Sequence, residues 1–220
     1  MTSWKKAVPT AAEQRELKKD ALLRQAAFAF RTNGYHGTSL TDIADALGIS
    51  KPTLYYYVKN KQDLLYQCHL AASEQALDSV CREMSFNALE RVCRTMSDYV
   101  RSMISEESYS VIILEEKSLK PQQLAYVIEC RDRFQAEVID MIGQGVKEGT
   151  IVPCEPKFAA FCVFGTANWV TKWYRPGGSW QVDEIATAIG DFTRSGLSAQ
   201  PVPPGLTALF GLAGRSENSR

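Results

Sequence analysis

Hydrophobic residues along this chain recur mainly at spacings of three and four, the period of a helix that is buried on one side. The pattern predicts two short helices between residues 39 and 58, and longer helices over these ranges: 13–33, 61–83, 87–104, 109–119, 121–148, 158–174 and 182–197. Beyond residue 61, the apolar pattern lacks the strict alternation that is typical of a half-buried strand. The sequence therefore predicts an all-α fold.

The two short helices carry signals at both of their ends. Ser39 is suited to cap the first helix, and Gly48 can end it because glycine adopts the left-handed backbone conformation without strain. Ser50 can cap the second helix, and Pro52 fits its first turn, where a missing N–H group is harmless. Apolar residues at helical spacing would form the buried side of the pair: Leu40, Ile43, Ala44, Leu47, Ile49, Leu54 and Val58. This arrangement predicts a helix-turn-helix, whose second helix enters the major groove of DNA.

The charge of the chain is unevenly divided, although it carries 25 basic and 25 acidic residues in total. Residues 1–66 hold ten basic and six acidic side chains, a net charge of +4, which leaves −4 for residues 67–220. A basic segment favours contact with DNA, because its cations displace the counterions that condense on the phosphates. The charge distribution therefore supports DNA binding by the N-terminal part of the chain.

Residues 22–65 resemble the DNA-binding domain of the TetR family of bacterial transcriptional regulators. The resemblance depends on Pro-Thr-Leu-Tyr at 52–55 and Val-Lys-Asn-Lys at 58–61. It also depends on upstream residues that match the end of the family's first helix: Ala26, Ala27, Phe30, Gly34, Tyr35, Thr38 and Ser39. Tyr57 and Val58 depart from the pattern, which often has His and Phe at these positions. The resemblance implies a repressor that binds a palindromic operator as a homodimer and is released by a small effector.

The same resemblance implies which residues contact double-stranded DNA. Lys51, Pro52, Thr53 and Tyr55 match positions that face bases, Tyr56, Tyr57 and Lys61 match positions that hold phosphates, and Ser39 and Thr41 match positions that flank the groove. The helix over 61–83 would then connect the DNA-binding domain to the rest of the chain. A ligand would act by changing the separation of the two DNA-binding domains, and it must bind one separation better than the other.

Composition and helix positions predict four regions. We expect a flexible arm over residues 1–12 and a three-helix helix-turn-helix domain over 13–66. A larger helical domain for ligand binding and dimerisation would follow over 67–198, and a tail rich in Pro and Gly over 199–220.

The last two predicted helices are candidates for a dimer interface. Residues 158–174 are almost wholly apolar, and a helix that is apolar all round must be buried on every side. Residues 182–197 offer small side chains at Ala186, Ala188 and Gly190. In the TetR family the final two helices pair with their copies, so the resemblance implies that both helices form the homodimer surface. The alternative is that they are core helices of a monomer.

Aromatic and polar residues of the larger domain could line a ligand site: Tyr109, Tyr126, Arg131, Phe134, Asn168, Trp169, Lys172 and Trp173. Small-molecule sites combine a mostly apolar lining with a few polar groups. Residues 168–178 and 182–185 are similar to the branch of the family that controls fatty-acid and steroid degradation, whose effectors are acyl-CoA thioesters. The resemblance thus implies a small apolar effector, with acyl-CoA thioesters as candidates. Aromatics at helical spacing can also be plain core, and a protein partner in place of an effector is the alternative function.

Other functional classes lack their usual residues in this sequence. There is no Gly-x-Ser-x-Gly motif, no histidine pair and no phosphate-binding glycine loop, so we expect no enzyme and no cofactor. His36, His69 and six scattered cysteines without a Cys-x-x-Cys pair predict no metal site. No apolar run reaches the length of a membrane span, and Met1–Lys6 is not an apolar signal segment. These observations predict a cytoplasmic protein with reduced thiols.

Overall fold

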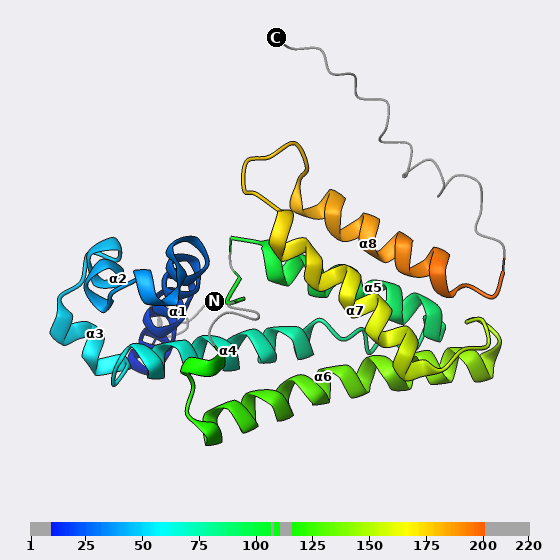
Figure 1. Ribbon diagram of the computed structural model, residues 1–220, viewed down its shortest axis with the longest axis horizontal. Coiled ribbons are helices and arrows are strands. Elements are labelled where there is room, and N and C mark those ends of the chain that lie inside the picture. Colours follow the sequence, from blue (N-terminus) through cyan, green and yellow to red (C-terminus); the bar gives the residue numbers. More distant parts are fainter. Residues whose placement is uncertain (1–9, 107, 111–115, 201–220) are drawn as a thin grey trace, which may run out of the picture. The chain divides into compact units, whose positions relative to one another are not determined.

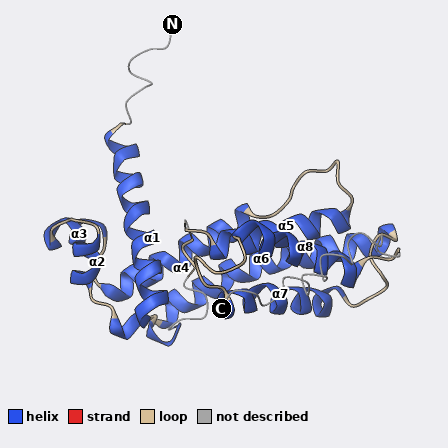
Figure 2. Ribbon diagram, turned by 90° about the horizontal axis from the view of Figure 1, so that it is seen from above, coloured by secondary structure: helices blue, strands red, loops and turns tan. Residues whose placement is uncertain are grey.

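The computed structural model describes residues 10–106, 108–110 and 116–200, and their regular structure is helical (Figures 1 and 2). The elements in chain order are α1 (Ala11–Gly37), α2 (Leu40–Ala46), α3 (Lys51–Tyr57), α4 (Lys61–Asp78), α5 (Ala88–Ile104), the 3₁₀ turn η2 (Glu116–Ser118), α6 (Pro121–Glu148), α7 (Pro156–Trp173) and α8 (Val182–Leu197). The only β pairing within these residues is an isolated bridge between Ile151 and Ser198. The predicted all-α fold is therefore confirmed.

The described residues form two compact units. Unit 1 contains residues 10–74 together with the described part of 106–130, and unit 2 contains residues 75–105 and 131–200. The sequence assigned 106–130 to the larger domain, whereas these residues pack with α1 to α4. The predicted functional division at 66/67 stays a prediction, and the predicted arm and tail lie largely outside the described residues.

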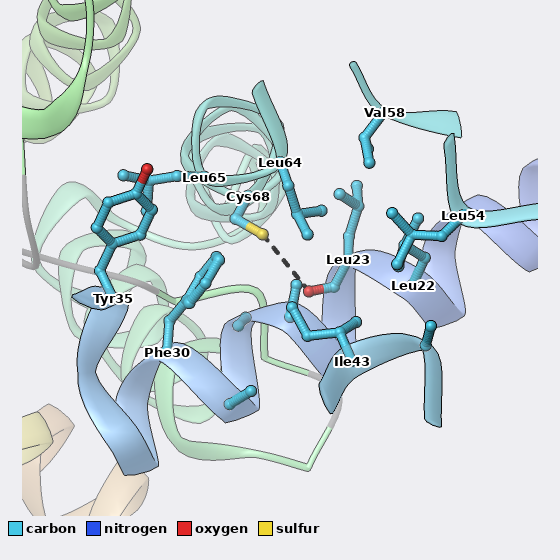
Figure 3. Close-up of a cluster of buried hydrophobic side chains, with 14 of the residues drawn as sticks. Leu22, Leu23, Phe30, Tyr35, Ile43, Leu54, Val58, Leu64, Leu65 and Cys68 are labelled. Atoms are coloured by element: carbon cyan, nitrogen blue, oxygen red, sulfur yellow. Dashed lines mark hydrogen bonds between the residues drawn. The ribbon is translucent and has the colours of Figure 1, made fainter. Parts of the chain in front are cut away.

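The core of unit 1 joins four helices to the segment that precedes and begins α6. Phe30 of α1, Ile43 of α2, Leu54 of α3 and Leu64 of α4 are all at most 1% exposed. Figure 3 shows these side chains turned toward one another, and Leu119 and Val127 complete the cluster. Burying an aliphatic or aromatic side chain of this size contributes about 1.5–3 kcal/mol. This core holds the helix-turn-helix in a fixed position on α1 and α4.

A buried thiol lies in the same cluster. The Cys68 Sγ donates a hydrogen bond to the Leu23 carbonyl oxygen at 3.6 Å. Burial raises the pKa of Cys68 to about 12, although the positive charge of Arg31 opposes the rise. The predicted burial of a thiol is confirmed at this position. An uncharged thiol is a small apolar group that packs well.

Gly48 ends α2 as the sequence predicted, whereas the predicted end of the first helix at residue 33 is only a break within α1. Gly48 has a φ of 64°, and its N–H donates to the Asp45 carbonyl oxygen at 3.0 Å in the turn before α3. Gly34 has a φ of 75° and breaks the geometry of α1, although a further helical turn continues to Gly37. The Thr38 hydroxyl then donates to the carbonyl oxygens of Ala29 and Gly34 at 3.2 and 2.9 Å. The buried hydroxyl thereby satisfies carbonyl groups at the end of the helix.

In unit 2, α7 and α8 pack against α5 (Figure 1). Ala186 and Gly190 of α8 are buried, and a Cβ atom added to Gly190 would lie 2.2 Å from the Ser97 Oγ and 3.2 Å from the Cys93 carbonyl oxygen. The small residues thus allow α8 to approach α5 within one chain. Ala186 and Gly190 were predicted to lie on the surface that meets a second copy of the chain. That prediction is wrong for these two residues, because they are buried within one chain.

Two predicted helices end differently in the structure. The predicted 61–83 helix stops at Asp78, and the chain then turns so that the Cys81 N–H donates to the Thr95 Oγ1 at 2.9 Å. The predicted helix over 109–119 is wrong at Tyr109 and Ser110, which are not helical, and only Glu116–Ser118 forms a 3₁₀ turn; residues 111–115 lie outside the described residues.

A tertiary contact holds the non-helical residues at the start of the segment that was predicted as a helix over 109–119. The Arg31 guanidinium donates to the carbonyl oxygens of Ser108 and Ser110 at 3.2 and 3.0 Å. A side chain of α1 therefore binds both carbonyl groups. Burial of the guanidinium lowers the pKa of Arg31, and the thiol of Cys68 opposes this shift.

Helix α7 has two distinct sides in the single chain. Ala160, Ala167 and Val170 are fully buried, whereas a stripe at spacings of three and four is exposed. The stripe consists of Phe158, Phe161, Cys162, Gly165, Trp169, Lys172 and Trp173. The expectation that this helix is buried on every side is thus wrong for one copy of the chain. None of the described helices is both long and apolar enough to cross a membrane.

Candidate nucleic-acid interface and effector centre

Helix α3 is held by its own cap and by two buried side chains. The Thr53 N–H donates to the Ser50 Oγ at 3.3 Å, and the two hydroxyl oxygens lie 2.8 Å apart. Leu54 and Val58 are 1% and 2% exposed and pack into the core of unit 1. A helix of this length is marginal by itself, so the cap and the core keep it in place.

The side of α3 opposite Leu54 carries the residues that were assigned to bases. Lys51, Pro52, Thr53 and Tyr55 are all exposed. Their side chains offer an ammonium group, a hydroxyl group and a phenol, which are donors or acceptors suited to base edges. The structure thus brings the four predicted base-facing residues together on one accessible surface.

The residues assigned to phosphates differ in exposure. Tyr56 is 64% exposed, and its ring lies edge-on to the ring of Tyr57 at 5.1 Å. Tyr57 is half-buried and packs against the core of unit 1. Tyr56 is therefore accessible to a ligand, whereas Tyr57 is partly used for packing.

Lys61 has partners inside the protein that the sequence did not indicate. Its Nζ donates to the carbonyl oxygens of Tyr35 and Thr38 at 2.8 and 2.9 Å and lies 4.4 Å from the centre of the Tyr35 ring. An ammonium group has three N–H donors, so one remains for a phosphate. Lys61 therefore connects the start of α4 to the end of α1.

The residues predicted to flank the groove stand at the start of α2. Ser39 is exposed and caps the helix, because the Asp42 N–H donates to its Oγ at 3.1 Å and its own N–H donates to the Asp42 carboxylate at 2.8 Å. The hydrogen bond from the Ser39 N–H lowers the pKa of Asp42 most, and the bond with the Ser39 hydroxyl lowers it further. Thr41 is half-buried. Ser39 thus combines a capping role with an accessible position.

A polar and aromatic cluster of unit 2 brings together part of the predicted ligand set: Tyr99 and Phe134 are buried, Phe164 and Asn168 are half-buried, and Arg131 is exposed. The Tyr99 hydroxyl donates to the Asn168 Oδ1 at 2.9 Å, and the Tyr99 ring lies 4.8 Å from the Phe134 ring and 6.0 Å from the Phe164 ring. Burial raises the pKa of Tyr99, and the positive charge of Arg131 opposes this rise. We call Tyr99, Arg131, Phe134, Phe164 and Asn168 the effector centre.

Sequence reasoning missed Tyr99, although a signal for it was present. It lies in the apolar stripe of α5, three residues after Met96 and four before Met103. A tyrosine at such a position places a hydroxyl in the core, and a buried hydroxyl needs a polar partner. Asn168 on α7 supplies that partner.

The remaining predicted ligand residues lie elsewhere. Tyr109 and Tyr126 belong to unit 1, where the Arg24 guanidinium lies 5.4 Å from the centre of the Tyr109 ring and Tyr126 is 47% exposed. Trp169, Lys172 and Trp173 lie on the exposed stripe of α7, and the Trp173 ring is 5.8 Å from that of Trp180. Of the eight predicted ligand residues, Arg131, Phe134 and Asn168 therefore belong to the effector centre, and the other five do not.

The capped pair α2 and α3, with a left-handed glycine between them and exposed polar residues on α3, defines a helix-turn-helix protein. Residues 22–68 match the family described as "Bacterial regulatory proteins, tetR family", and residues 85–197 match "Tetracyclin repressor-like, C-terminal domain". Together the two matches span most of the sequence. The chain belongs to the TetR family of transcriptional regulators.

Individual relatives agree with this assignment. The HTH-type transcriptional repressor KstR2 of Mycobacterium tuberculosis is 26% identical over 195 residues, which cover 82% of this chain and 95% of that protein. The structure of the TetR family transcriptional regulator PfmR from Thermus thermophilus is 28% identical, with a TM-score of 0.70, and covers 80% of this chain and 97% of PfmR. AibR in complex with isovaleryl coenzyme A and operator DNA is 26% identical, with a TM-score of 0.66, and covers 79% of this chain and 96% of AibR.

Proposed function

We propose that this protein is an effector-controlled transcriptional repressor that binds a palindromic operator as a homodimer and is released by an acyl-CoA thioester. The observation that carries the proposal is the surface of α3, where Lys51, Pro52, Thr53 and Tyr55 are exposed on the side opposite the buried Leu54. A surface of this kind on a capped recognition helix is suited to the major groove.

In this proposal the exposed side of α3 reads the operator. Lys51, Pro52, Thr53 and Tyr55 face base edges, Tyr56, Tyr57 and Lys61 hold phosphates, and Ser39 and Thr41 flank the groove. The phosphate contacts set the register of the protein on the duplex, and the base contacts select the sequence. Lys61 contributes only the N–H group that is left after its two bonds to α1.

The homodimer would form through the exposed stripe of α7, together with α8. Phe158, Phe161 and Trp169 of the stripe are 69%, 50% and 66% exposed, and Phe192 of α8 is 47% exposed. Large apolar side chains that are exposed in this number are typical of an interface. Dimerisation also suits the target, because two recognition helices reach half-sites about 34–36 Å apart, or a multiple of that distance.

The interface can be tested by sedimentation of the purified protein. Phe161→Glu should convert the dimer to monomer, because it places a carboxylate in an apolar contact. Met84→Glu is a matched control, since Met84 is 72% exposed and lies outside α7 and α8. A Phe161→Glu protein that sediments as the parent dimer would contradict this interface.

For the effector, we assign the acyl group to the effector centre. Its three aromatic rings offer an apolar lining, and Arg131 can hold a CoA phosphate. The AibR complex with isovaleryl coenzyme A supports an acyl-CoA as the ligand class. The exposed stripe residues Trp169, Lys172 and Trp173 suit the dimer surface better than this centre, because they lie on the opposite side of α7 from its buried residues.

Release from DNA would pass through the helices that run from one unit into the other. Helix α4 crosses the division between units near Glu74, and α6 crosses it at Cys130. An acyl-CoA that binds one arrangement of the two units more tightly shifts the population toward it. The released state would then hold the two recognition helices at a spacing that no longer fits both half-sites.

The test uses a duplex that the purified protein selects from a random pool, with binding followed by fluorescence anisotropy. We expect tight binding at low salt, and isovaleryl-CoA or a longer acyl-CoA should weaken it by roughly 5–150-fold while free CoA does not. Absence of any selected duplex would refute the repressor function. Duplex binding that no acyl-CoA alters would refute the assignment of an acyl-CoA effector and favour the alternative of a protein partner. A hydrolysis assay with the same acyl-CoAs tests whether the protein is an enzyme instead.

A further inference from the structure

Arg15 lies on the first turns of α1, before the segment that matches the family model. That match begins at residue 22, whereas α1 begins at Ala11. Thr10 and Glu13 form a reciprocal cap, because the Thr10 N–H donates to the Glu13 carboxylate at 2.6 Å and the Glu13 N–H donates to the Thr10 Oγ1 at 3.2 Å. The cap makes residues 11–21 a rigid extension of the helix.

This extension places a cation against the recognition helix. The Arg15 guanidinium carbon lies 5.1 Å from the centre of the Tyr56 ring. Both residues are exposed, and Tyr56 is the outermost of the aromatic residues on α3, with 64% of its surface accessible. Stacking on a ring restricts the guanidinium group while its N–H groups stay accessible at the edge.

No carboxylate of the residues that the structure describes forms an ion pair with Arg15, whereas Arg24 further along α1 binds Asp20 at 2.8 Å. The carboxylate of Glu13, the nearest acidic residue before Arg15, accepts a hydrogen bond from the Thr10 N–H. Arg15 thus keeps a full positive charge beside a residue that is assigned to a phosphate.

We propose that Arg15 binds a DNA phosphate next to the one that Tyr56 holds, so that α1 extends the DNA interface beyond the helix-turn-helix. The inference rests on the proposed repressor function and adds a contact that the helix-turn-helix motif does not include. The guanidinium group suits this role because its planar fork donates two parallel N–H bonds to phosphate oxygens. The Tyr56 ring sets its position before DNA arrives, which lowers the entropy lost on binding.

The test measures the affinity of the parent protein, Arg15→Ala and Arg15→Lys for the selected duplex between 50 and 300 mM salt. Each phosphate contact contributes about 0.9 to the slope of log K against log salt, so Arg15→Ala should lower the slope by about 1.8 in a dimer. We expect at least about tenfold weaker binding for Arg15→Ala and a smaller loss for Arg15→Lys, which keeps the charge but not the fork.

Arg94→Ala is the matched control. The Arg94 guanidinium carbon lies 3.8 Å from the centre of the Phe86 ring in unit 2, so the variant also removes one charge and one cation–π pair. Its slope should equal that of the parent. An equal loss of slope in both variants would show a general charge effect and overturn the inference.

A double-mutant cycle separates a direct contact from an effect through the Tyr56 ring. If Arg15 binds phosphate, Arg15→Ala must still lower the salt slope in a Tyr56→Ala background. If Arg15 only orients Tyr56, the second substitution changes nothing and the inference fails while the repressor function stands. A parent protein that selects no duplex would overturn both.

Discussion

The Lys61 ammonium group donates a hydrogen bond to the Tyr35 carbonyl oxygen at 2.8 Å and lies 4.4 Å from the centre of the Tyr35 ring. Tyr35 follows the break in α1 at Gly34, and Lys61 is the first residue of α4. One side chain therefore joins the end of α1 to the helix that leads out of the DNA-binding domain. A residue assigned only to DNA by its motif also stabilises the fold.

The first prediction concerns this double role. Lys61→Met should lower the free energy of unfolding by roughly 1–3 kcal/mol, because two carbonyl groups lose a charged donor. It should also lower the salt slope of duplex binding by about 0.9 for each protomer that loses a phosphate contact. Urea unfolding and anisotropy titrations measure the two effects. Lys59→Met is the control, because Lys59 is exposed and should leave the free energy of unfolding unchanged. Parent-like unfolding of Lys61→Met would contradict the structural role.

The second prediction separates the effector centre from the DNA interface. Tyr99→Phe removes the hydroxyl that donates to Asn168, which should destabilise the fold by about 1 kcal/mol. Acyl-CoA should then release the duplex less effectively, while the affinity for DNA alone is unchanged. The comparison variant is Tyr174→Phe, whose ring lies just after the end of α7. A normal acyl-CoA response in Tyr99→Phe would place the effector elsewhere.

The third prediction concerns the contact between α8 and α5. Gly190→Ala places a Cβ atom 2.2 Å from the Ser97 Oγ and 3.2 Å from the Cys93 carbonyl oxygen, so the Ser97 hydroxyl must rotate or α8 must shift away from α5. We expect a loss of about 1–3 kcal/mol, the usual range for overpacking a core. Gly196→Ala on the same helix meets no atom within 4 Å and should be neutral or stabilising by up to about 1 kcal/mol. Thermal unfolding of both variants tests this, and equal melting temperatures would show that the contact is not tight.

The fourth prediction is an alkaline loss of stability that Cys68 causes. Its pKa is raised from 9.0 to about 12 in the folded protein, so the unfolded chain loses this proton first. The stabilisation is complete below about pH 9 and is lost as the pH rises toward 12, with about 2 kcal/mol gone by pH 10.5.

Urea unfolding at pH 8 and pH 10.5 measures this effect. Cys68→Ala should lose less stability than the parent between the two pH values, although it is less stable at pH 8. Cys81→Ala, which removes a half-buried thiol outside this core and outside the proposed dimer surface, should follow the parent. Parallel pH dependence of Cys68→Ala and the parent would show that another group causes the alkaline loss.

Local sequence signals were sufficient for the helix-turn-helix. Ser39, Gly48, Ser50 and Pro52 each act within a few residues of their own position, through caps and backbone conformations. Such features depend on the chemistry of single residues and need no distant partner. The helix that the apolar pattern predicted over 87–104 also agrees with α5, and Asn87 caps that helix in the structure.

Helix ends that depend on distant contacts were predicted less well. The residues after Asp78 bond to Thr95 on α5, and Arg31 on α1 binds the carbonyl groups of Ser108 and Ser110. Each contact joins residues that are far apart in sequence, so the local apolar pattern cannot predict it. The assembly of the effector centre around Tyr99 was missed for the same reason.

The amino-acid sequence by itself thus determined the helical class and the helix-turn-helix motif, because these follow from periodicity and capping residues, and its resemblance to the TetR family indicated the family. The tertiary structure decided which side chains are exposed and which residues each of them contacts. It brings Lys61 next to Tyr35, Gly190 next to Ser97 and Arg15 next to Tyr56. The physical reason is that long-range packing and hydrogen bonding depend on how whole helices meet, which no single stretch of sequence specifies.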